Sequence, residues 1–160
     1  MTTDQRDHDH LRRCVELATA ALEAGDGPFG SVLAGPDGTN LAEDHNHETT
    51  SGDPTAHPEF ALARWAAANL SPADRTASTV YTSGEHCPMC AAAHAWCGIG
   101  RIVYAASTAQ LVAWRTGWGQ PPGPVSPLPV NAVAPSVTVV GPVAPFDEQM
   151  RLIHERALNR

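Results

Sequence analysis

Two short motifs place metal-binding and acid–base side chains together in this chain. Residues 57–59 read His-Pro-Glu, and residues 87–90 read Cys-Pro-Met-Cys. If a helix begins at Cys87, its thiolate and that of Cys90 lie on one side of the first turn. With the imidazole of His57 they form a His-Cys-Cys donor set suited to Zn²⁺. Three protein ligands leave the fourth tetrahedral position open for water, which is typical of a catalytic zinc site.

Glu59 lies two residues beyond His57, near enough to reach that water. Zinc lowers the pKa of bound water from about 15.7 to about 7, so a zinc-bound hydroxide is available at neutral pH. Glu59 would take the water proton, pass it to a ring nitrogen of the substrate, and then protonate the departing amine. The pattern therefore predicts hydrolytic deamination of an aminated ring, with Glu59 as the proton shuttle.

A redox site or a structural zinc site would explain the Cys-x-x-Cys motif but not the His-x-Glu motif. A thioredoxin-like redox site would not need His57 and Glu59, and a structural zinc would need a fourth ligand. Cys14, on a separate predicted helix, is a poor candidate for that ligand. His94 and Cys97 lie roughly 6–10 Å further along the helix, so we expect them to pack rather than bind the ion.

Composition narrows the function classes. The chain has 160 residues, a formal charge of −7, and ten basic residues that are all Arg and are scattered. The absence of a basic cluster argues against a nucleic-acid partner. Residues 1–10 are polar, and no stretch is apolar enough to span a bilayer. We therefore expect a cytoplasmic protein with reduced thiols and no membrane partner.

Hydrophobic periodicity predicts alternating strands and helices. Helices are expected at residues 11–24, 57–69, 87–97, 108–115 and 146–158, and strands at residues 29–34, 40–43, 79–82, 101–105 and 137–140. This order predicts an α/β fold, a three-layer α/β/α sandwich around a central mixed five-stranded sheet. We expect one domain over residues 1–160. It includes a Pro-rich loop at 118–135 and a strand and helix at 136–160.

Three stretches carry a resemblance to a known family. They are Gly-Pro-Phe-Gly at 27–30, Thr-Thr-Ser-Gly-Asp-Pro-Thr-Ala-His at 49–57, and Tyr-Thr-Ser at 81–83 leading into the cysteine pair. With the His-x-Glu and Cys-x-x-Cys motifs, the chain resembles the cytidine deaminase-like superfamily, and more narrowly bacterial guanine deaminases and related nucleobase deaminases. The resemblance implies a Zn²⁺ cofactor, a small heterocyclic base as substrate, and a homodimer. In such a dimer the C-terminal segment could be a swapped arm over the partner's pocket.

Guanine, converted to xanthine and ammonia, is the leading substrate by this resemblance. Cytosine, an amino-s-triazine and guanosine remain alternatives, and the sequence cannot rank them. A tRNA adenosine deaminase and a non-catalytic zinc-binding module are less favoured. Glu59 argues against the module, because a purely structural zinc has no use for that carboxylate.

The resemblance also implies substrate contacts. Asn46 should hydrogen-bond the polar edge of the ring, the backbone at Ala56 should contribute, and Phe29 and Trp96 should wall the flat base. We expect His45 and His47, on either side of Asn46, to be solvated.

Several positions depart from the family pattern. The family usually has Ala at the position of Pro58 and Pro at the position of His86, which brings a titratable ring beside a thiolate ligand. Residues 107–135 contain no Asp or Glu, although guanine deaminases carry late acidic residues that read the base. Trp114 and Trp118 suggest a flat apolar lid there instead. The sequence leaves the roles of His86 and these two tryptophans open.

Overall fold

Five strands form one mixed sheet in the order β2-β1-β3-β4-β5 in the computed structural model, which describes residues 2–160. The strands are β1 Gly30–Ala34, β2 Asn40–His45, β3 Thr79–Gly84, β4 Arg101–Ala106 and β5 Val139–Val140. β1 pairs antiparallel with both β2 and β3, whereas β3–β4 and β4–β5 are parallel. The predicted mixed five-stranded sheet is confirmed, with β5 shorter than expected.

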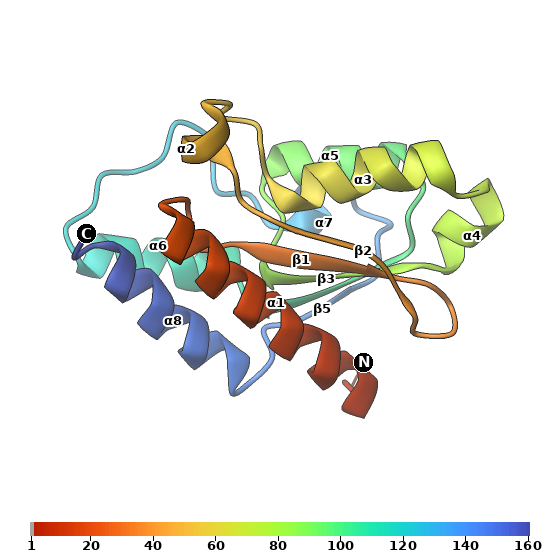
Figure 1. Cartoon of the computed structure of the whole chain (residues 1–160), viewed down its shortest axis with the longest axis horizontal. Helices are drawn as coiled ribbons and strands as arrows, with labels where there is room; N and C mark the ends of the chain where they lie inside the picture. Colours follow the sequence, from red (N-terminus) through yellow and green to blue (C-terminus); the bar gives the residue numbers. More distant parts are fainter. Residues whose placement is uncertain (1) are drawn as a thin grey trace.

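Helices cover both faces of this sheet (Figure 1). They are α1 Gln5–Ala24, α2 Glu48–Ser51, α3 Pro58–Asn69, α4 Pro72–Ala77, α5 Pro88–Trp96, α6 Thr108–Gly117, α7 Val130–Val133 and α8 Phe146–Ala157. α1, α6 and α8 lie on one face, and α3, α5 and α7 lie on the other. The α/β/α sandwich predicted from the sequence is therefore confirmed.

α1 packs directly on the sheet because β1 begins with a glycine. A Cβ atom at Gly30 would overlap the side chain of Leu17 and the carbonyl oxygen of Cys14. Cys14 is fully buried in this contact, and burial raises the pKa of its thiol well above the usual value. Its role is packing, as expected for a residue outside the donor set.

Element boundaries differ from the prediction where short polar motifs start helices. α1 begins at Gln5 because the side chains of Asp4 and Asp7 form a reciprocal capping box at its first turn. α4 was not expected, although Ser71 caps it and Pro72 occupies its first position. The single turns α2 and α7 lie inside segments predicted to be loops.

The C-terminal segment packs on its own chain. β5 pairs with β4, and α8 contacts α1 and β4. The Arg160 guanidinium also donates to the carbonyl oxygen of Asp26 at 2.8 Å. A swap of this segment between two copies stays a prediction. Among residues 2–160, no helix combines the length and apolar character needed to cross a membrane.

Candidate zinc and deaminase site

Two helix starts position the metal-binding side chains. His57 is the N-cap of α3 and Cys87 is the N-cap of α5, each with extended backbone and each followed by a proline at the first helical position. Neither side chain caps its own helix. Both side chains are therefore free to bind an ion, and the positive end of the α5 dipole favours the thiolate form of Cys87.

The histidine nitrogen lies at zinc-like distances from both sulfurs. Nδ1 of His57 lies 3.6 Å from Sγ of Cys87 and 3.5 Å from Sγ of Cys90. A tetrahedral zinc with a Zn–S bond of about 2.3 Å and a Zn–N bond of about 2.05 Å holds nitrogen and sulfur about 3.6 Å apart. All three donor atoms lie within 4.8 Å of one another, so the set can surround one Zn²⁺ ion.

Proton binding within this set also suits a cation. A hydrogen bond from Cys90, together with one from His57, lowers the pKa of Cys87 to about 4 even though burial opposes ionisation. The bond to Cys87 in turn raises the pKa of Cys90 and, against the effect of burial, raises that of His57 to about 9. One thiolate is thus already present, and a bound cation would replace the protons on the other two groups.

Glu59 is buried beside the sulfur atoms. The Thr82 hydroxyl donates to its Oε1 at 2.8 Å, and its Oε2 lies 3.9 Å from Sγ of Cys90. Burial raises the pKa of Glu59 above its usual value. A carboxyl group whose pKa moves towards neutrality is better matched to accepting and returning a proton.

The loop before α3 places Asn46 close to His57 through Glu48. The Asn46 side-chain amide donates to Glu48 Oε2 at 2.6 Å, and its oxygen accepts from the Glu48 backbone N–H at 2.9 Å. Glu48 Oε1 lies 3.5 Å from Nε2 of His57, the ring nitrogen that faces away from the sulfurs. Each polar group of Asn46 keeps capacity for one more hydrogen bond.

Glu48 was missed by sequence reasoning. A carboxylate on the far nitrogen of a metal-ligating histidine fixes the ring orientation and raises its basicity. The available signal was an acidic residue two positions after Asn46, although Asp53 in the same loop is acidic as well.

Ala56 lies in the same loop and is largely engaged by it. Its N–H donates to the carbonyl oxygen of Asp53, and its own carbonyl accepts from the N–H of His47. Only the carbonyl of Ala56 retains capacity for the predicted backbone contact with a base.

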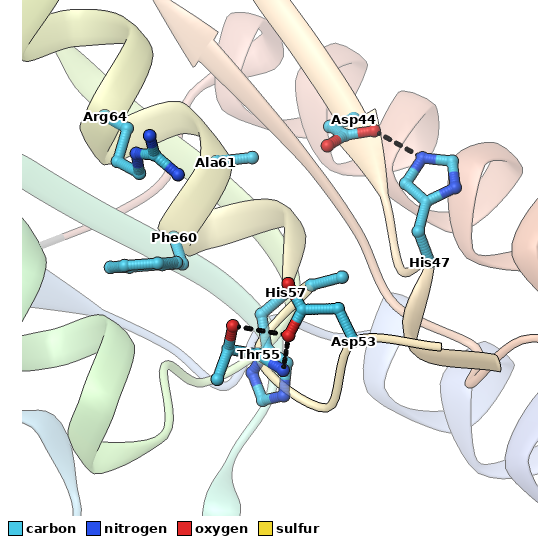
Figure 2. Close-up of a pocket in the computed structure, with 9 residues that line it drawn as sticks. Asp44, His47, Asp53, Thr55, His57, Phe60, Ala61 and Arg64 are labelled. Atoms are coloured by element: carbon cyan, nitrogen blue, oxygen red, sulfur yellow. Dashed lines mark hydrogen bonds and ion pairs between the residues drawn. The ribbon is translucent and has the colours of Figure 1, made fainter. Parts of the chain in front are cut away.

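A polar pocket lies on the outer side of His57 (Figure 2). It is lined by Asp44, His47, Asp53, Thr55, Ala56, His57, Phe60, Ala61 and Arg64. None of Glu59, Cys87 and Cys90 lines it. This pocket is therefore distinct from the side of His57 that faces the two sulfurs.

Phe29 lies near Asn46, because its carbonyl oxygen accepts from the Asn46 N–H at 3.0 Å. Its ring contacts Gly84 and meets the ring of His154 edge-on, with centroids 5.1 Å apart. The centroid of the His154 ring, on α8, also lies 6.2 Å from that of the Trp114 ring. Burial lowers the pKa of His154 to about 4, so the ring is neutral. The α8 periodicity could have placed His154 on the inward face, but nothing local linked it to Phe29.

Trp96 lies at the surface. It ends α5 and is 89% exposed, six residues beyond Cys90. At 1.5 Å per residue this is about 9 Å along the helix axis from Cys90. The contact of Trp96 with a base stays a prediction.

His86 is enclosed rather than solvated. It is 1% exposed and meets His94 edge-on, with centroids 5.3 Å apart. Neither ring nitrogen has a hydrogen-bond partner among residues 2–160, and burial lowers its pKa well below the usual value. His86 thus packs as a neutral ring behind Cys87, and His94 packs against it as expected.

Comparison with known families decides the class. The family described as "Cytidine and deoxycytidylate deaminase zinc-binding region" matches residues 4–106. This range includes His57, Glu59, Cys87 and Cys90. The chain belongs to this family. The match spans the predicted donor set and the proton-carrying carboxylate together, so the resemblance seen in the sequence is confirmed.

Two relatives that are deaminases differ in substrate. The chain is 43% identical to the guanine deaminase of Bacillus subtilis over 97 residues, covering 60% of this chain and 62% of that protein. It is 36% identical to a tRNA-specific adenosine deaminase of Haemophilus influenzae, covering 63% of this chain and 58% of that protein. The chain thus spans less than two thirds of each of these relatives.

A solved structure extends the likeness of fold to the whole chain. The guanine deaminase of Nitrosomonas europaea superimposes with a TM-score of 0.72 at 20% identity, covering 100% of this chain and 87% of that one. At this identity the likeness supports the fold.

Proposed function

We propose that the chain is a zinc-dependent aminohydrolase of a small heterocyclic base, with guanine as the first candidate. The observation that carries the proposal is the position of Glu59. One carboxylate oxygen is held by Thr82, and the other lies beside Cys90 at a three-donor set with the dimensions of a zinc site. The Bacillus subtilis relative supports guanine among the candidate bases.

His57, Cys87 and Cys90 would hold the ion. Bound zinc would supply Lewis-acid activation of a water molecule near neutral pH. Glu59 would accept a proton from that water and deliver it to a ring nitrogen of the base. It would then carry the second proton to the departing amine, so that guanine and water yield xanthine and ammonia.

Asn46 and Phe29 would orient the base. The remaining donor and acceptor of the Asn46 amide match a ring edge that presents both, and its bonds to Glu48 fix the amide orientation. The Phe29 ring and the Asn46 side chain both lie beside Gly27, where an added Cβ would be 3.4 Å from the ring and 3.7 Å from Asn46 Cγ, so Phe29 would offer an aromatic surface near Asn46. Glu48 would act as a positioning residue for both Asn46 and His57.

A tRNA adenosine deaminase is the second candidate, because such an enzyme from Haemophilus influenzae is 36% identical. The formal charge of −7 and the scattered arginines weigh against it, since RNA binding relies on cationic surfaces.

The test is ammonia release from guanine, guanosine, cytosine, adenine and an amino-s-triazine by the native chain and by Glu59→Ala. We expect bound zinc in both proteins and turnover in the native chain alone. Equal turnover would remove Glu59 from the mechanism. Turnover of none of these rings, together with tight tRNA binding, would favour the second candidate.

Zinc dependence has its own test. Cys87→Ala should lose the metal and part of the thermal stability, because the site joins the starts of α3 and α5. Cys97→Ala, which changes a cysteine on the same helix outside the donor set, is the matched control. Full zinc content in Cys87→Ala would contradict the assignment of the ligands.

The proposal includes a cytoplasmic homodimer. The exposed indole of Trp96 is a surface that a second copy could cover. In such a dimer the indole could contact the base bound by the partner. Light scattering of the native chain and of Trp96→Ser tests this. A native monomer would contradict the dimer.

A further inference from the structure

A second group of possible metal ligands lies at the end of β2. Asp26, His45 and His47 each place one donor atom within 4.8 Å of the others. The two imidazole rings lie side by side, with centroids 4.3 Å apart and planes tilted by 32°. This group shares no residue with His57, Cys87 and Cys90.

Each histidine has one ring nitrogen already held by an acceptor. Nδ1 of His45 bonds the carbonyl oxygen of Asn46 at 2.9 Å, and Nε2 of His47 bonds the carboxylate of Asp44 at 2.9 Å. Both acceptors require the proton to be on the bonded nitrogen. Nε2 of His45 and Nδ1 of His47 are thus left with free lone pairs. Figure 2 shows the Asp44–His47 bond and the remaining nitrogen on the other side of the ring.

Such a pattern is the one that metal-bound histidines adopt. A ligating imidazole almost always donates its second N–H to a carboxylate or a backbone carbonyl, which fixes the tautomer and increases the basicity of the ligating nitrogen. His47 has the first kind of acceptor and His45 the second.

Asp26 contributes a buried carboxylate, 1% exposed. Burial works to raise its pKa, but hydrogen bonds from Thr50 and Thr49 hold the pKa below the usual value, so the group is anionic. Its Oδ1 accepts from the backbone N–H groups of Thr49 and Thr50 in α2, whereas Oδ2 accepts only from the Thr50 hydroxyl. Oδ2 therefore keeps a lone pair for a cation.

We propose that Asp26, His45 and His47 bind a divalent transition-metal cation, Zn²⁺ or a similar ion such as Co²⁺ or Ni²⁺, at a site separate from that of the two cysteines. Two imidazoles and a carboxylate suit these borderline ions better than Mg²⁺ or Ca²⁺, which prefer oxygen ligands. Water would complete the coordination.

The cation would join two segments that carry the proposed base contacts. Asn46 lies between the two histidines, and Phe29 lies three residues beyond Asp26. The Asn46 N–H already donates to the Phe29 carbonyl oxygen. Occupancy would therefore stiffen the pairing of Asn46 with Phe29. This consequence rests on the proposed function, whereas cation binding does not.

Cobalt titration tests the site. Co²⁺ bound by Cys87 and Cys90 gives thiolate-to-metal charge-transfer absorption, whereas Co²⁺ on nitrogen and oxygen ligands does not. We expect native protein to bind a second equivalent of Co²⁺ that adds no charge-transfer absorption. His45→Ala and His47→Ala should weaken that second equivalent by about tenfold or more and leave the charge-transfer band unchanged.

The control is His8→Ala, which removes a histidine of α1 that contacts Thr3 and Phe146. It should bind both equivalents as the native chain does. Asp44→Asn removes the negative charge of the acceptor of His47, while its amide oxygen can still accept from the backbone N–H of His45. It should weaken the second equivalent while the fold, checked by circular dichroism, is kept. The proposal is overturned if native protein binds only the equivalent with charge-transfer absorption. It is also overturned if the second equivalent binds equally to native protein, His45→Ala and His47→Ala. If native protein with bound Co²⁺ gave no charge-transfer band, that result would instead count against Cys87 and Cys90 as ligands of the proposed catalytic site.

Discussion

Two neighbouring residues of β3 each serve a buried carboxylate on opposite faces of the sheet. Tyr81 donates to Asp7 of α1, and Thr82 donates to Glu59 of α3. Asp7 also receives two hydrogen bonds from the Arg101 guanidinium, both at 2.9 Å, whereas among residues 2–160 no cationic Arg bonds Glu59. Although burial opposes it, the bonds from Arg101 lower the pKa of Asp7, while burial raises that of Glu59.

This contrast separates a structural carboxylate from the one proposed to carry a proton. Asp7 is held as an anion by a fixed positive charge, so exchanging a proton would cost stability. Glu59 has one neutral donor on one oxygen and leaves the other oxygen towards the sulfurs, so its two protonation states are closer in energy. Burial opposes ionisation of both groups, and the number and charge of the partners decide whether that effect is offset, as it is at Asp7, or prevails, as it does at Glu59.

Glu59→Gln should give the largest effect on activity. Turnover should fall about 10²- to 10⁴-fold, because the amide keeps the Thr82 bond but cannot transfer a proton. The free energy of unfolding should stay equal or rise slightly, since ionised Glu59 is costly in its buried position. Steady-state kinetics and urea unfolding measure the two quantities, and a marked loss of stability with native turnover would reverse the assignment.

Asp7→Asn should give the largest effect on stability. We expect a loss of about 3 kcal/mol, because the change leaves the Arg101 charge without its partner. Turnover per folded molecule should be unchanged. Asp9→Asn, which removes an exposed carboxylate paired with Arg12, is the matched control and should cost much less, because solvent screens that pair. Equal losses of unfolding free energy in the two variants would show that the buried Asp7–Arg101 pair stabilises the fold no more than an exposed pair does.

The stability that Asp7 contributes should depend on pH in a defined direction. Its folded-state pKa lies below the ordinary value of 3.8, so the unfolded chain binds the proton more tightly. The contribution is complete above the ordinary value and is lost as pH falls through the folded-state pKa. Urea unfolding of native protein and Asp7→Asn should therefore give curves that converge only in acid. Convergence near neutral pH would contradict the assignment.

Paired substitutions on β3 should give the smallest and most selective effects. Thr82→Val removes a bond that lowers the pKa of Glu59, so the acidic limb of the activity profile should move to higher pH. Tyr81→Phe should leave that limb in place and cost about 1 kcal/mol of stability. Ser31→Ala controls for the Ser31–Thr82 hydrogen bond, which Thr82→Val also removes. If Tyr81→Phe also shifted the acidic limb of the pH–activity profile, the two faces of the sheet would not act separately on Glu59.

The sequence predicts features that local patterns determine. The starts of α3 and α5 could be placed because proline marks the first helical position after His57 and Cys87. The Asp7–Arg101 network could not be predicted, because the two residues are 94 positions apart and no local pattern links them. The contact of Trp96 with a base rests on family resemblance alone, because no local pattern places its side chain. Glu48 escaped notice because a carboxylate in a polar loop is usually solvated.

The prolines at positions 58 and 88 have a consequence for assembly. A residue that precedes proline is sterically confined to extended conformations even in the unfolded ensemble. His57 and Cys87 have such backbone angles in the structure, with ψ of 138° and 166°. Less backbone entropy is therefore lost when these two residues are brought together, so the prolines preorganise the proposed donor set.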